Sequence, residues 1–156
     1  MNKNVKSLIG WWKVLGRDQS DPFMKFFVFY MCLDAWMTAE SGKDRDEDKL
    51  NWLINTPNDL NHHRQGIQGG AKFQSWLNGL MRESPVDDMR PSKLGVRTVS
   101  LSDTSDFSQV VKFIYQIRCN LFHGSKSPLN ARDKHLVNLS GKILERWIEW
   151  TSAKIE

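Results

Sequence analysis

Apolar residues recur every three or four positions in six stretches of the chain, a spacing that places them on one face of an α-helix. The predicted helices cover residues 5–15, 22–40, 47–55, 71–81, 106–122 and 130–154. This pattern predicts an all-α fold with a short N-terminal helix. The stretch 85–103 has no clear period and predicts either a long connection or a short pair of strands.

The helix predicted over 22–40 is apolar on nearly all sides, so we expect it at the centre of the bundle. Asp21 and Pro22 form a start signal, and Gly42 supplies a residue that tolerates the left-handed conformation at a helix end. Asp34 is the one acid in this helix before Glu40. It is a candidate partner for an arginine elsewhere in the core, and a solvated position at the helix edge is an equal alternative.

The helix predicted over 106–122 has two apolar surfaces. Its core stripe contains Val110, Phe113, Ile114, Ile117 and Leu121, and its second apolar flank contains Val111, Tyr115, Cys119 and Phe122. A polar strip beside the core stripe contains Gln109, Lys112, Gln116, Asn120 and His123. A helix that is apolar on two sides needs two neighbours, and the second neighbour is expected to be the same helix of another copy.

Arg118 falls between these two apolar surfaces, where a charge needs a carboxylate, a phosphate or a route to solvent. His123 follows five residues later, about 140° further round the helix and about 7.5 Å along its axis. The two side chains of one chain are therefore not expected to point at the same spot. A two-fold dimer through this helix would gather two arginines and two histidines in one cleft.

The composition indicates a single folded domain. The 156 residues are enough for one domain over 1–156, and a hydrophobic content of 40% with seven tryptophans argues against disorder. A net charge of +4 permits a nucleic-acid partner without requiring one. Two cysteines in apolar stretches indicate core residues in a reducing compartment, and we expect a cytoplasmic protein without a signal sequence or a membrane span.

The segment Ile117-Arg-Cys-Asn-Leu-Phe-His-Gly-Ser-Lys126 resembles the Arg-x4-His motif of HEPN domains. This resemblance implies an up-and-down bundle of four to five main helices, usually dimeric. Such a domain often acts as a metal-independent endoribonuclease in toxin–antitoxin or anti-phage systems. Arg118, Asn120 and His123 are then the candidate catalytic residues, with Tyr115, Lys126 and Arg64 as candidate RNA contacts. The expected partners are RNA, a second copy and an antitoxin.

The residue types suit RNA cleavage without a metal. Histidine can transfer the 2′-hydroxyl or 5′-oxygen proton, and arginine can hold the phosphate through two hydrogen bonds. Asn120 can orient the imidazole or an oxygen of the phosphate. The expected products carry a 2′,3′-cyclic phosphate and a 5′-hydroxyl.

Other interpretations remain open. Histidine before a helix-ending glycine commonly acts as a cap, and an arginine flanked by apolar residues commonly pairs with a core acid. A HEPN module without activity could bind RNA, a nucleotide or a protein, and a structural dimerisation bundle is a third class. We expect no metal and no cofactor, because adjacent His62 and His63 point apart and no further ligand follows at the required spacing.

Overall fold

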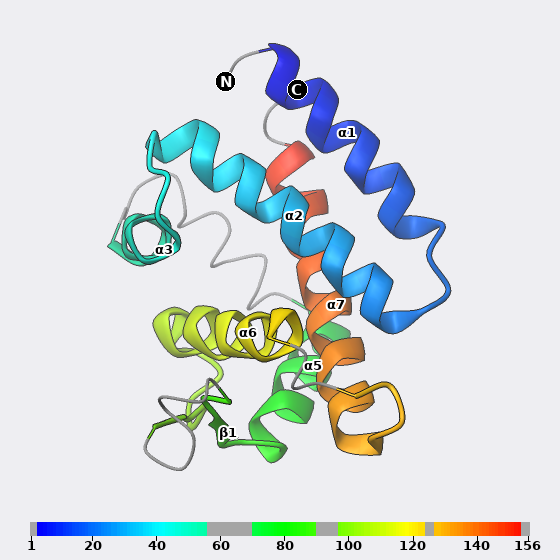
Figure 1. Ribbon diagram of the computed structural model, residues 1–156, viewed down its shortest axis with the longest axis vertical. Coiled ribbons are helices and arrows are strands. Elements are labelled where there is room, and N and C mark those ends of the chain that lie inside the picture. Colours follow the sequence, from blue (N-terminus) through cyan, green and yellow to red (C-terminus); the bar gives the residue numbers. More distant parts are fainter. Residues whose placement is uncertain (1–2, 56–69, 90–96, 124–126, 154–156) are drawn as a thin grey trace.

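A computed structural model describes residues 3–55, 70–89, 97–123 and 127–153 of the chain. Within these ranges the protein forms six helices and one pair of short strands (Figure 1). The helices are α1 (Lys3–Arg17), α2 (Pro22–Ser41), α3 (Asp46–Asn55), α5 (Ala71–Arg82), α6 (Phe107–Phe122) and α7 (Ala131–Ala153). The all-α class predicted from the apolar spacing is therefore confirmed.

Helix α2 lies at the centre of the fold, as its all-round apolar character predicted. It packs against α1, α7 and α3 (Figure 1). Its buried side chains are Phe26, Val28, Phe29, Tyr30, Cys32, Leu33, Trp36 and Met37. The predicted ends are also confirmed: Oδ1 of Asp21 accepts a hydrogen bond from the backbone N–H of Met24, and Gly42 ends the helix at φ 65°.

The helices are not all aligned, so an up-and-down bundle is too simple a description. Helices α1 and α2 run side by side in opposite directions, but α6 lies across α7, and α3 is seen almost along its axis in Figure 1. The two apolar flanks of α6 explain the crossing. A helix that is apolar on two sides buries more surface against neighbours that meet it from different directions.

The aperiodic stretch after α5 contains a short strand pair, one of the two structures predicted for it. Strand β1 (Val86–Asp87) pairs antiparallel with β2 (Thr98–Val99), with Val86 opposite Val99. Both strands contact α6. Val86 is buried, and residues 87 and 89 bond to Asn120, which lies on the polar strip of α6.

Helix α7 buries a wide arc of its surface. Leu136, Val137, Ile143 and Leu144 are all fully buried. The reason is that α7 packs against α2, α5 and α1, so it has neighbours on several sides. Ion pairs join its outer edge to the N-terminal helices, with Arg17 2.7 Å from Glu149 and Lys25 2.8 Å from Glu145.

Both cysteines are buried, as the sequence predicted for small core residues. Burial raises the pKa of the Cys32 thiol to about 12, and nearby Lys13 opposes this shift. The thiol of Cys32 therefore stays protonated at neutral pH, and protonated thiols are poor nucleophiles.

Substitution by alanine should change the stability of the protein in opposite directions at two glycines of α1, Gly10 and Gly16. A Cβ at Gly10 meets nothing within 4 Å, whereas a Cβ at Gly16 would lie 2.9 Å from Cζ of Phe29 and 3.1 Å from Cγ1 of Val28. Gly10→Ala should raise the free energy of unfolding by about 0.5–1 kcal/mol through helix propensity. Gly16→Ala should lower it by about 1–3 kcal/mol through overpacking against α2.

Urea denaturation of the two variants measures both effects, and Gly10→Ala serves as the control for Gly16→Ala. A Gly16→Ala variant as stable as Gly10→Ala would contradict the close approach of α1 to α2.

Candidate functional site

The guanidinium of Arg118 lies among aromatic rings, as its position between two apolar surfaces of α6 predicted. Its Cζ is 4.5 Å from the ring centre of Phe122, 5.4 Å from that of Tyr30 and 5.8 Å from that of Tyr115. The side chain is 23% exposed. Cation–π attraction favours this position, but the ring faces supply no strong hydrogen-bond acceptor for the guanidinium.

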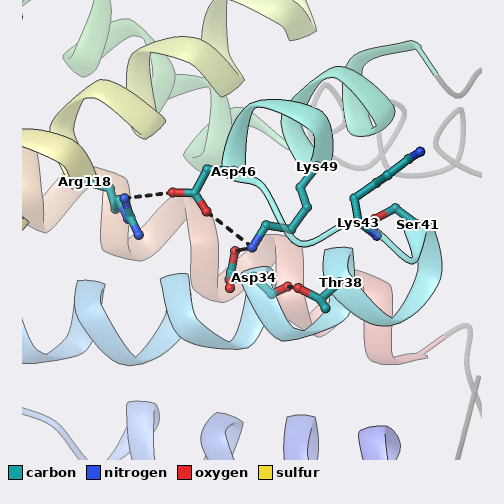
Figure 2. A network of polar contacts seen from close by, with 7 residues as sticks. All are labelled: Asp34, Thr38, Ser41, Lys43, Asp46, Lys49 and Arg118. Atoms are coloured by element: carbon teal, nitrogen blue, oxygen red, sulfur yellow. Dashed lines mark hydrogen bonds and ion pairs between the residues drawn. The ribbon is translucent and has the colours of Figure 1, made fainter.

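The carboxylate that pairs with Arg118 belongs to Asp46 of α3, so direct pairing with Asp34 was a wrong expectation. Nη1 of Arg118 lies 3.1 Å from Oδ2 of Asp46. Asp34 instead pairs with Lys49, whose Nζ is 2.5 Å from Oδ1 of Asp34 and 3.3 Å from Oδ1 of Asp46. Figure 2 shows the resulting charge chain of Asp34, Lys49, Asp46 and Arg118, which joins α2, α3 and α6.

The charge chain contains two acids and two bases in alternating order, so it carries no net charge. Burial lowers the pKa of Arg118, but Tyr30 and Asp46 act in the opposite direction and the net shift is upward. Burial also raises the pKa of Tyr30 far above its ordinary value, although Arg118 opposes that shift. Near neutral pH, Arg118 is therefore charged and Tyr30 is a neutral phenol.

Asn120 is buried and holds α6 to the segment after β1. Its Oδ1 accepts hydrogen bonds from the backbone N–H of Met89 at 3.1 Å and from Nε2 of Gln116 at 2.9 Å. Its Nδ2 donates to the backbone carbonyl of Asp87 at 2.7 Å. The sequence pattern placed Asn120 on a polar strip with His123, but the segment 86–89 covers Asn120 and leaves His123 exposed. These bonds use the amide for structure, and no bond joins it to His123.

His123 is exposed and follows the last residue of α6. Its backbone N–H donates to the carbonyls of Cys119 and Leu121, so the residue caps the helix. Within the part of the chain that the structure describes, no hydrogen bond, ion pair or ring contact joins His123 to Arg118. One chain keeps the two candidate groups apart, as the helical spacing predicted.

The second apolar flank of α6 is mostly covered within the chain. Val111 and Cys119 are buried, and α3 packs against α6. A second copy could therefore contact only part of this flank, because Val111 and Cys119 are already covered within the chain. Phe122 remains 43% exposed and stacks on Phe27 of α2 at 5.3 Å between ring centres.

Tyr115 lies between the charge chain and a groove. It contacts Arg118 on one side and lines a groove of about 440 Å³ between α3, β2 and α6. Arg97 and Lys112 also line this groove, together with the acid Glu47. Tyr115 is thus placed where it can contact a bound molecule, and its role as an RNA contact stays a prediction.

Several residues singled out in the sequence lie outside the described ranges. These are Arg64, Lys126, Gly124 and the pair His62–His63. Among the described residues, no group of three or more His, Cys, Asp or Glu side chains is arranged to hold a metal ion. The described helices also include none with both the length and the apolar character needed to cross a membrane.

The charge chain brings in two residues that the sequence pattern did not single out. Asp46 and Lys49 lie in a run of mixed charges over 43–49, and such a run is typical of a solvated surface. Their spacing of three residues was the available signal, since it places both side chains on one face of a helix. Lys49 is only 4% exposed, so this face points inward.

Comparison with known proteins gives no relative from which a function could be carried over: no family model, no curated protein and no solved structure matches the chain. Any functional assignment therefore rests on the residues described above.

Lys49→Met should test how much the charge chain contributes to stability. Methionine keeps the apolar stem but removes the cation between Asp34 and Asp46, so two carboxylates lose a shared partner. We expect the free energy of unfolding to fall by about 1–3 kcal/mol. Lys43→Met, at an exposed lysine just outside α3, is the matched control and should change stability little. Equal urea midpoints for both variants would show that the chain contributes nothing measurable.

Proposed function

We propose that this protein is a metal-independent endoribonuclease whose reacting groups are Arg118 and His123 at the end of α6. One observation carries the proposal. The Nε of Arg118 is buried and has no hydrogen-bond acceptor among the described residues. The guanidinium also lies beside the ring of Phe122, the residue that precedes His123 in the sequence. A buried donor without an acceptor is uncommon, and an oxygen of a bound phosphate would satisfy it.

The chemistry divides between two residues. Arg118 supplies fixed positive charge to the phosphate as negative charge develops in the transition state. His123 is exposed at the helix end, where it can take the proton from the 2′-hydroxyl or give one to the departing 5′-oxygen. The products expected are a 2′,3′-cyclic phosphate and a 5′-hydroxyl.

Asp46 has a defined part in this proposal. It neutralises Arg118 through Nη1 while no substrate is bound, which leaves the other N–H groups of the guanidinium to a ligand. A phosphate must then share Arg118 with a carboxylate. Asp46 keeps the charged side chain in place among the aromatic rings and weakens its attraction for phosphate.

A complete site requires a second copy of the chain, because Arg118 and His123 of one chain do not meet. An apolar patch beside His123 supports such a pairing. It consists of Met24 and Phe27, one turn apart on α2, and Phe122 at the end of α6. Met24 is 50% exposed and Phe122 is 43% exposed. Two such patches in contact would bring the two His123 residues close to the interface.

A second candidate function is a HEPN-like binding module that does not cleave RNA. The observation that favours it is the ion pair of Arg118 with Asp46 together with the structural use of Asn120. In this case the C-terminal end of α6 would bind RNA, a nucleotide or a partner protein such as an antitoxin. Cleavage assays separate the two candidates.

The first experiment measures cleavage of mixed RNA in EDTA. Arg118→Ala and His123→Ala should each reduce the rate at least about 100-fold, the typical contribution of a group that transfers a proton or stabilises charge. Arg118→Lys should restore only part of it, because lysine cannot form the two parallel hydrogen bonds. Arg146→Ala, at an exposed arginine on α7, is the matched control and should cleave like the wild type.

Cleavage that persists unchanged in both variants would remove Arg118 and His123 from the reaction. If the wild-type protein retains RNA without cleaving it, the binding module is the correct alternative.

The second experiment tests the pairing of two chains. Sedimentation of the wild type at micromolar concentration should give a dimer, and Phe122→Asp should give a monomer, because a charge would be buried in the apolar patch. Trp11→Asp is the matched control: Trp11 is 61% exposed but lies on α1, away from α6 (Figure 1). A wild-type monomer, or a dimer that survives Phe122→Asp, would contradict pairing through this patch.

A further inference from the structure

A second groove lies between the start of α2 and the first half of α7. Its volume is about 580 Å³. The lining residues are Gln19, Ser20, Pro22, Lys25, Ala131, Lys134, His135, Asn138 and Lys142. No carboxylate is among them. The groove is therefore lined by three lysines and a histidine without a neutralising acid on its surface.

Two of the lysines are not compensated by other side chains. Lys25 pairs with Glu145 at 2.8 Å, but Lys134 and Lys142 form no ion pair within the described residues. The groove also receives the first residues of two long helices, Pro22 of α2 and Ala131 of α7. Asp21 caps α2 and Asp133 lies in the first turn of α7, so these carboxylates offset the partial positive charge of both helix ends. The positive charge of the groove therefore comes from its lysines.

The spacing along α7 favours a ligand that carries more than one negative group. Lys134 and Lys142 are eight residues apart, which places their Cα atoms about 12 Å apart along the helix axis. Asn138 lies midway and contributes donors on the same face. A chain of phosphates matches this row of donors better than one isolated anion does.

We propose that this groove binds the phosphate backbone of single-stranded RNA through Lys134 and Lys142. The inference rests on the proposed function, since it adds a substrate-holding site to the nuclease. Among the described residues, no Phe, Tyr or Trp side chain lines the groove, so bases have little surface there on which to stack. The contacts go to phosphate, and binding here is independent of base sequence and sensitive to salt.

The experiment measures binding separately from cleavage. The probe is a short fluorescent oligouridylate with 2′-O-methyl groups, which lacks the 2′-hydroxyl and cannot be cleaved by the proposed reaction. Fluorescence anisotropy gives the affinity of wild type and of the double variant Lys134→Gln/Lys142→Gln as salt is varied. Lys43→Gln/Lys72→Gln removes the same charge from exposed lysines outside the groove and is the matched control.

The loss of two phosphate contacts should reduce the slope of log affinity against log salt by about 1.4, because each contact on a single strand contributes about 0.7. Between about 50 and about 200 mM salt, the wild type should lose about sevenfold more affinity than the groove variant. The control variant should keep the wild-type slope, and thermal unfolding should show that both variants are folded.

A groove variant with wild-type affinity and slope overturns the inference, and so does a control variant that weakens binding equally. If the groove variant loses affinity for poly-glutamate and keeps its affinity for RNA, an acidic protein is the ligand and the inference also fails. Cleavage of unmodified RNA is scored separately. A protein that binds the probe through the groove but cleaves nothing contradicts the proposed nuclease and leaves this inference standing.

Discussion

The burial of Arg118 is the constraint on which the arrangement of α2, α3 and α6 depends. A guanidinium among three aromatic rings is stable only if a nearby charge compensates it. Asp46 supplies that charge, and Lys49 then compensates both Asp46 and Asp34. Each helix contributes at least one member of the charge chain, so none of the three can shift without leaving a charge without its partner.

The sequence was sufficient to predict those features that depend on residues close together in the chain. The start of α2 follows from Asp21 and Pro22, and the hydrogen bond from Met24 to Asp21 is the local interaction that these residue types favour. The ends of α6 and the central place of α2 were predicted for the same reason. Helical periodicity and caps act over a few residues, so a single sequence carries them.

Contacts between distant segments could not be predicted in this way. Asn120 was a candidate catalytic residue because its own helix places it on a polar strip with His123, yet the backbone of residues 87 and 89 covers it. A short strand pair without a clear period carries no signal for where it packs. Asp46 was missed for a related reason: an acid in the first turn of a helix already has a local explanation in the helix dipole, so nothing indicated a second role with Arg118.

Arg118 and the groove lysines Lys134 and Lys142 differ in how their positive charge is compensated. This difference suits them to different tasks. Arg118 is fixed, partly buried and already shared with Asp46, so its attraction for a distant anion is weak and its geometry is well defined. Lys134 and Lys142 lack ion-pair partners among the described residues and line an open groove, so their attraction is stronger and less selective. Charge for attracting a polyanion works best when it is uncompensated and hydrated, whereas charge for stabilising a transition state works best when it is preorganised and shielded from water. In the proposed function this difference separates the capture of RNA from the chemistry, because Asp46 pairs with Arg118 whereas Lys134 and Lys142 have no ion-pair partner among the described residues.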